Sequence, residues 1–245
     1  MKRILPFLLL VAGLMLAGSA QAQSLSLDLG DGGGSTTGRI VELVALMTVL
    51  SVVPGLLVTV TSFTRIVVVL SFLRTALGIQ QTPPNTVLIS LALFLSAFVM
   101  GPTLQRSYDD GIAPLIAEKL ETATALERTA KPFHDFMQTH VRDQDLQLFM
   151  GLGRMPPVAT PDDTPYRALL PAFLISELRR AFEIGFLLFL PFLIIDIVVA
   201  SLIMSMGMVS LPPNVISLPF KLIFFVLIDG WYLVCGSLIQ SFGPG

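Results

Sequence analysis

Charged residues inside long apolar stretches are the part of this sequence that could do chemistry. Seven of them interrupt the apolar second half of the chain: Glu177, Arg179, Arg180, Glu183, Asp196, Lys221 and Asp229. In membrane helices such side chains either pair with one another or mark a path for ions. We favour pairing, or contact with another subunit, over a direct transport role. The i,i+3 spacing predicts that Glu177 and Arg180 neutralise each other, and we expect Asp196 and Lys221 to form a buried pair.

Motifs typical of metal sites, nucleotide-binding sites and hydrolase active sites are missing from the sequence. His134 and His140 are six residues apart, so on one helix they point to different sides and do not make a metal pair. The sequence has no phosphate-binding loop, no dinucleotide fingerprint and no nucleophile elbow. We therefore expect no cofactor and no enzymatic activity.

The composition is that of a membrane protein. Hydrophobic residues make up 53% of the chain and charged residues 13%, against about 25% charged in soluble domains. The mean hydropathy is +0.80. The net charge of -2 argues against a nucleic-acid partner bound through a basic face. The single cysteine, Cys235, lies in an apolar run and is interpreted as a packing residue.

The N-terminus has the pattern of a secretory signal peptide over residues 1–22. Lys2 and Arg3 precede a short apolar stretch, which ends before the small-residue site closed by Ala22. We predict cleavage between Ala22 and Gln23, which leaves the mature N-terminus outside the cytoplasm. The alternative is an uncleaved anchor helix, although the apolar stretch is short for a span of about 20 residues.

The rest of the chain is predicted to be all-α: a membrane-associated protein with two kinked helical hairpins and a helical periplasmic insertion. Its parts are a flexible linker at 23–38, a first hairpin at 39–104, the insertion at 105–167 and a second hairpin at 168–245. Hydropathy alone places four spans at 40–63, 86–104, 184–206 and 215–240. The insertion holds ten acidic and seven basic residues. With Arg65 and Arg74 facing the cytoplasm, the positive-inside rule places the insertion outside.

A repeated turn motif, G-x4-P-P-N, joins the helices of each hairpin. Its residues are Gly78, Pro83, Pro84 and Asn85 in the first turn, and Gly207, Pro212, Pro213 and Asn214 in the second. Glycine suits a left-handed position after a helix, and proline suits the start of the next one. The alternative is two unrelated proline-rich turns. Internal repeats are common in transporters, where a functional path often lies between them.

Several longer motifs resemble the FliP family of flagellar type III export-gate subunits, over roughly residues 40–242. They are the run Ser62–Arg74, both hairpin turns, Pro171–Phe173, Ser176–Leu178, Phe182–Gly185, Pro191–Asp196, Leu218–Leu222 and Asp229–Trp231. The resemblance implies a pore assembled from several copies of this chain with FliQ and FliR, inside the flagellar basal body of the bacterial inner membrane. It also implies contact with membrane lipid and other export-apparatus proteins, and passage of unfolded flagellar substrates.

The resemblance also implies roles for particular residues. Met204, Met206 and Met208 match a methionine-rich loop that closes the pore, although Val209 and Ser210 stand where relatives can carry further methionines. Thioether side chains are flexible enough to seal around irregular chains. The alternative is that these are ordinary apolar loop residues.

Three further positions match family residues at contacts between copies: Phe136, Phe149 and Glu177. For the two phenylalanines, the alternative is a small core of the insertion itself. For the whole protein, the alternative function is an ion channel or secondary transporter subunit. That reading draws on the internal repeat and the intramembrane carboxylates.

Overall fold

The structure is a computed structural model that describes residues 44, 47, 48, 51, 55, 58–79, 81–208 and 212–243. The chain divides into two units, 1–48 and 49–245, and all helices discussed below belong to the second unit. The predicted signal peptide with its Ala22–Gln23 cleavage site, the linker and the predicted break at Pro54 lie outside the described residues.

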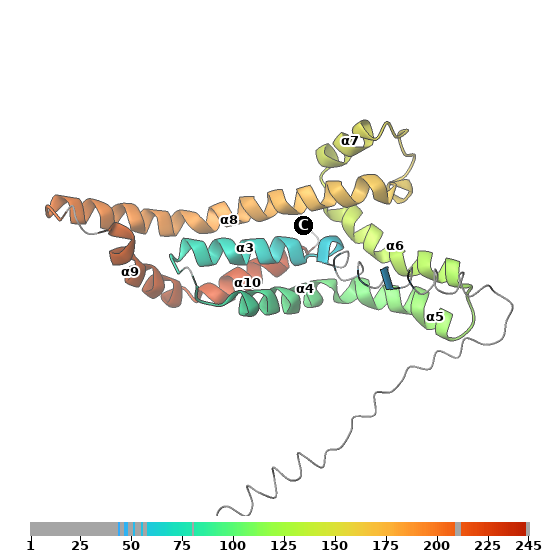
Figure 1. Ribbon diagram of the computed structural model, residues 1–245, viewed down its shortest axis with the longest axis horizontal. Coiled ribbons are helices and arrows are strands. Elements are labelled where there is room, and N and C mark those ends of the chain that lie inside the picture. The colour runs from blue at the N-terminus through green and yellow to red at the C-terminus, as the bar shows by residue number, and fades with distance from the viewer. Residues whose placement is uncertain are drawn as a thin grey trace, which may run out of the picture. The chain divides into compact units, whose positions relative to one another are not determined.

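The first hairpin consists of α3 (Phe63–Ala76) and α4 (Asn85–Ser107). α3 is the central element, because it packs against both α4 and α8 (Figure 1). It buries Ile66, Val69, Leu70 and Leu73, whose spacing of three and four residues places them on one helix face. The predicted apolar helices therefore meet in a core around α3.

α4 does not end where the hydropathy falls. It runs on through a π-helical turn, η1 (Tyr108–Ile112), and α5 (Ala113–Ile116). Together they form a 32-residue segment, Asn85–Ile116, that is long and apolar enough to cross a membrane. The helix thus extends past residue 104, where the predicted apolar span ends. Hydropathy depends on the polarity of side chains, so it does not detect backbone hydrogen bonds that continue a helix into a more polar segment.

The region predicted as an insertion is helical. It contains α6 (Thr122–His140), α7 (Asp143–Leu152) and a short 3-10 turn, η2 (Pro161–Asp163). α6 lies against α4 and η1, where Ser107 Oγ donates to the carbonyl of Thr129 at 2.7 Å. α7 packs on α8.

The second hairpin begins with α8 (Tyr166–Ser205), a 40-residue helix that continues through Pro171 and Pro191. Each proline removes one backbone hydrogen bond without ending the helix. After the turn come α9 (Pro213–Leu227) and α10 (Gly230–Gln240), which meet at a bend of 64°. The bend is at Asp229, whose φ of 51° is left-handed.

These helices confirm the predicted all-α fold class, since the described residues contain no strand. Within the part of the chain that the structure describes, two helices are long and apolar enough to cross a membrane, or three if the bent α9–α10 pair is one span. The predicted span 184–206 lies inside α8, which starts at Tyr166. The predicted span 215–240 corresponds to the bent pair and not to one straight helix.

Candidate functional site

The most deeply buried ion pair in the described part of the chain joins the two hairpins. Arg65 of α3 and Glu177 of α8 form a two-pronged ion pair, in which Arg65 Nε donates to Glu177 Oε2 at 2.9 Å and Nη2 donates to Oε1. Their side chains are 4% and 0% exposed. This planar arrangement of two parallel hydrogen bonds is the strongest geometry available to a charged pair.

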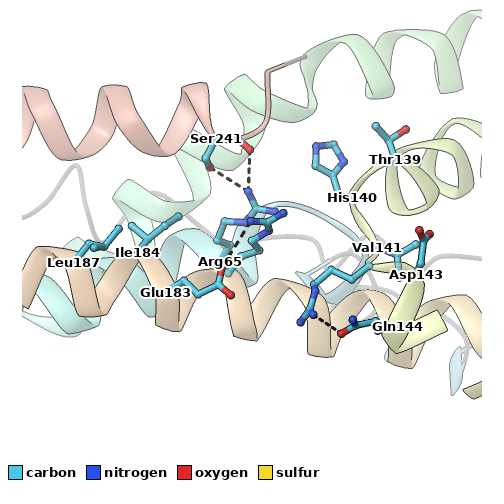
Figure 2. Close-up of a pocket in the computed structure, with 12 residues that line it drawn as sticks. Arg65, Thr139, His140, Val141, Asp143, Gln144, Glu183, Ile184, Leu187 and Ser241 are labelled. Atoms are coloured by element: carbon cyan, nitrogen blue, oxygen red, sulfur yellow. Dashed lines mark hydrogen bonds and ion pairs between the residues drawn. The ribbon is translucent and has the colours of Figure 1, made fainter. Parts of the chain in front are cut away.

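The end of α10 completes the surroundings of Arg65. Nη1 donates to the backbone carbonyl of Ser241 at 3.0 Å and contacts its hydroxyl at 3.1 Å (Figure 2). The Phe242 ring covers the guanidinium, with Arg65 Cζ 3.8 Å from the ring centre. Two distant parts of the sequence, α8 and the end of α10, therefore supply the partners of one buried arginine.

The pairing predicted for Glu177 is wrong. Arg180 contacts Glu183 at 3.6 Å, and Arg179 contacts the same carboxylate at 3.1 Å. Glu177 faces the protein interior instead and binds Arg65. Arg65 is consequently not a free charge facing the cytoplasm, so of the two arginines used for the orientation argument only Arg74 keeps a partly exposed side chain.

Phe136 lies at the edge of this buried group. Its ring packs against Phe173 of α8, His140 of its own helix and Phe242, with ring centres 5.9, 4.4 and 6.2 Å apart. Phe136 is therefore half-buried within its own subunit.

Of the three residues proposed for contacts between copies, Glu177 has no exposed surface. It can therefore affect a contact with a neighbouring copy only through the residues that surround it.

His140 contacts the rings of Phe136 and Phe242, close to Arg65 of the buried ion pair. Its Nδ1 contacts the carbonyl of Phe136 at 2.8 Å, and its ring centre lies 5.4 Å from that of Phe242. Burial, together with the nearby charge of Arg65, lowers the pKa of His140 below its usual 6.5, because both disfavour the imidazolium form.

Phe149 has a different setting. It lies half-buried on α7, between Leu148 and Leu152, whose side chains are exposed. This side of α7 thus carries an apolar surface that the described protein does not cover.

Asp196 and Lys221 lie close together, across the second hairpin. Lys221 Nζ donates to Asp196 Oδ2 at 2.6 Å and to the carbonyl of Ala76 in α3 at 3.1 Å. Ser217 donates to the other carboxylate oxygen at 2.5 Å. Lys221 is 5% exposed, so this second polar contact also ties α9 to the first hairpin.

Both hairpin turns begin with a glycine in the left-handed conformation. Gly78 and Gly207 have φ values of 78° and 75°, and the residue after Gly207, Met208, donates its N–H back to Ile203 O at 3.2 Å. This is the hydrogen-bond pattern of a helix ending in a left-handed glycine.

The prolines and asparagines of the motif then start the next helix. Pro84 precedes α4 and Pro213 opens α9. In the first turn, Arg74 Nη1 donates to Asn85 Oδ1 at 2.5 Å and contacts the carbonyl of Pro83 at 3.4 Å. In the second turn, Ser217 Oγ lies 3.2 Å from Asn214 O, and Pro212 is exposed.

The methionines of the second turn lie at the end of α8. Met204 and Met206 are 64% and 70% exposed, and Met208 is half-buried. Val209, Ser210 and Leu211 of the same loop lie outside the described residues.

Sequence reasoning missed the partners of the buried charges: Arg65 as the partner of Glu177, and Ser241, Phe242, Ser217 and Ala76. One signal for the first was available, since an arginine within an apolar helix needs a partner. Nothing in local spacing identifies that partner 112 residues away.

Comparison with known proteins places the chain in a family. The family model described as the FliP family matches residues 46–238. The flagellar biosynthetic protein FliP of Caulobacter vibrioides is 57% identical over 99% of this chain and 91% of its own length. The proteins of that name from Bacillus subtilis and Rhizobium meliloti are 52% and 47% identical, covering 82% and 95% of this chain and 91% and 97% of their own lengths. This chain belongs to the FliP family.

Proposed function

We propose that this chain is a pore-forming core subunit of the flagellar type III export gate, which conducts unfolded flagellar substrates across the inner membrane. The observation that carries the proposal, beside family membership, is the uncovered apolar surface of the long helices. Only 28% of the most apolar stretch in Asn85–Ile116 and 17% of that in α8 are buried. Such surfaces need lipid or other subunits to cover them.

The exposed side chains along α8 support an assembly. Phe182, Phe186 and Leu187 are each more than half exposed. Phe182 lies within the charged segment 177–183 of this helix, and the other two residues follow it. Several copies of the chain, together with the smaller FliQ and FliR subunits and other export-apparatus proteins, would cover this surface. In this proposal the 105–167 insertion lies on the periplasmic side, within the basal body.

The methionine loop is the proposed gate. Met204 and Met206 lie at the end of α8 with 64% and 70% of their surface exposed. Flexible thioether side chains at such a position suit a seal that yields to a passing chain and closes again. Met208, at the start of the turn, would contribute to the same constriction.

The charged residues favour this structural role over the alternative of an ion channel or transporter. Glu177 is bound by Arg65, and Asp196 is bound by Lys221 and Ser217. Carboxylates held in this way are already neutralised and hydrogen-bonded, whereas a site for a transported cation needs free oxygen ligands. Asp229 is exposed at the bend between α9 and α10.

The mass of the complex after gentle detergent extraction tests the proposal. We expect several copies of this chain together with two other small membrane proteins by native mass spectrometry. Deletion of the gene should abolish filament growth, and the wild-type gene should restore it. A purified monomer or dimer that conducts ions in liposomes would overturn the proposal in favour of the transporter alternative.

The proposed contact between copies is tested separately at α7. Phe149→Ala should lower the yield of the homo-oligomer on native gels, because it removes apolar area beside Leu148 and Leu152. Phe136→Ala is the matched variant, since Phe136 packs against Phe173 and Phe242 inside its own subunit. It should lower thermal stability more than Phe149→Ala does. An unchanged oligomer in Phe149→Ala would remove this residue from the interface.

A further inference from the structure

The segment that follows α10, residues 241–243, packs on α3 and on the end of α6. Arg65 Nη1 of α3 donates to the carbonyl of Ser241 at 3.0 Å. The Phe242 ring lies 5.4 Å from the His140 ring of α6, measured between ring centres. Positions 241 and 243 are exposed, so the segment lies at the surface. We call these three residues the strap, because they join α10 to two other helices.

His140 is the titratable group that the strap contacts. Its Nδ1 lies 2.8 Å from the carbonyl of Phe136, and its ring packs against the rings of Phe136 and Phe242. It also lines a cavity of about 740 Å³, and Figure 2 shows it there beside Arg65 and Ser241. The imidazole therefore contacts two apolar rings and a space that water can enter, so a proton can reach it in the folded protein.

The charged groups around His140 are balanced while its ring is neutral. Those that line the cavity or lie beside it are Arg65 of α3, Arg142 and Asp143 at the start of α7, and Glu177, Arg180 and Glu183 of α8. Residues 230–243 contribute none. Glu177 and Glu183 are already paired with arginines, and Asp143 is exposed. With three guanidinium groups and three carboxylates, an imidazolium would add one uncompensated positive charge.

The Phe242 ring is shared between His140 and Arg65. The guanidinium already covers this ring, with Arg65 Cζ 3.8 Å from its centre. A cation on an aromatic face is favourable by about 0.5–2 kcal/mol. A second cation against the same ring would gain a similar amount but would repel the first in partly buried surroundings, where charges are weakly screened. Protonation of His140 therefore opposes the docked position of Phe242.

Burial determines the sign of the effect. Burial lowers the pKa of His140 below its usual 6.5, and the charge of Arg65 acts in the same direction. The carbonyls of Phe136 and Phe242 act in the opposite direction without reversing it. A conformation that lowers the pKa of a group becomes less favourable as the pH falls. Lifting the strap would let water reach both the imidazole and the guanidinium, so protonation favours the lifted position.

We propose that the strap is a pH-sensitive contact, which holds α10 on α3 and α6 while His140 is neutral and lifts when His140 takes up a proton. Lifting breaks the hydrogen bond between Arg65 and Ser241 and removes Phe242 from the guanidinium, but it leaves the pair with Glu177 in place. The proposal concerns contacts within one subunit and does not rest on the proposed pore. Only the compartment does: with the insertion in the periplasm, external acid would loosen the end of α10.

The test uses the full-length protein in detergent with a nitroxide spin label on the strap. The label is attached at Gly243→Cys in a Cys235→Ser background, because position 243 is exposed and Cys235 is the single native cysteine. The mobile fraction in the EPR spectrum should rise as the pH falls from about 7 to about 5, and should be constant above that range. Because one proton is involved, the ratio of lifted to docked strap should rise by no more than about tenfold per pH unit.

Three variants separate His140 from general effects of acid. His140→Gln should abolish the rise, because an amide does not titrate. His134→Gln is the matched control and should keep the rise, since His134 is the other histidine of α6 and contacts the carbonyl of Thr164 instead of the strap. Phe242→Ala should make the label mobile at every pH, which provides the spectrum of the lifted strap.

Several results would overturn the proposal. A constant mobile fraction down to about pH 5 would do so in the wild-type background, whether or not the variants fold. So would a strap that becomes less mobile in acid, because the carbonyl of Phe242 would then bind the imidazolium more strongly than burial opposes it. A rise that persists in His140→Gln would assign the effect to other groups. A rise that occurs only together with loss of the helical circular dichroism signal would assign it to unfolding.

Discussion

The buried Arg65–Glu177 pair allows a quantitative prediction. Glu177→Gln keeps the size of the side chain but removes its charge, leaving the guanidinium of Arg65 buried at 3% exposure with Ser241 and the Phe242 ring as remaining partners. Removing one member of a buried pair typically costs about 3–5 kcal/mol, mostly because the other charge is left uncompensated. We expect Arg65→Met to cost a similar amount through the loss of its partners.

The double variant is the informative one. Arg65→Met with Glu177→Gln leaves no buried charge at this site, so its loss of stability should be much smaller than the sum of the two single losses. The interaction free energy from the cycle should therefore be about 3 kcal/mol. For a protein of about this size, a single change of 3–5 kcal/mol lowers the melting temperature by roughly 6–20 °C.

Thermal unfolding of the detergent-solubilised protein, followed by circular dichroism, measures all three variants and the wild type. Additive losses, with an interaction free energy below about 0.5 kcal/mol, would show that the two charges act independently and would refute the reasoning.

Three further predictions concern the second polar contact, the repeated turn and pH. Lys221→Ala should destabilise the protein by about 3 kcal/mol and impair the assembled complex on native gels, and adding Asp196→Asn should recover part of the loss; normal assembly in the single variant would exclude a role for the pair. Gly207→Ala should cost about 1–2 kcal/mol in thermal unfolding because of its left-handed φ, whereas Gly236→Ala, inside α10 and with open space at its Cβ, should be neutral or slightly stabilising. The lowered pKa of His140 means that the unfolded chain takes up its proton first, so stability should be greatest above pH 6.5 and fall as the pH drops below it. His140→Gln should flatten that slope in unfolding measured from pH 7.5 to 5, and an unchanged slope would assign it to other groups.

Local pattern predicted much of the fold. The alternation of apolar runs and proline-rich turns was sufficient for the all-helical class, because helix formation depends on preferences within a few residues. It did not identify the central helix α3, which begins where the predicted span 40–63 ends. The Asp229–Gly230 bend carried a readable signal too, since Asp-Gly pairs favour turns. It was absorbed into one apolar run because hydropathy averages over it.

The contacts across the hairpins were harder to predict. Glu177 has Arg180 one turn away, and the spacing rule for helices pairs them. In the folded chain, Glu177 points inward to Arg65, because burial of α8 against α3 decides which side of the helix each charge occupies. Asp196 and Lys221 were paired correctly only because they are isolated charges in two neighbouring helices. Ser241 and Phe242 gave no sign of their role, since a serine and a phenylalanine after an apolar helix are common in many proteins.

The length of α8 has a mechanical consequence. At about 1.5 Å per residue, its 40 residues form a rod of about 60 Å, roughly twice the thickness of the hydrocarbon layer. One end packs against α7 and the other carries Met204. A tilt of about 5° around the middle would therefore move each end by about 2.6 Å, in opposite directions. If α8 moves as a rigid body, a small displacement beside α7 would therefore shift the methionine end without any change in the backbone between them.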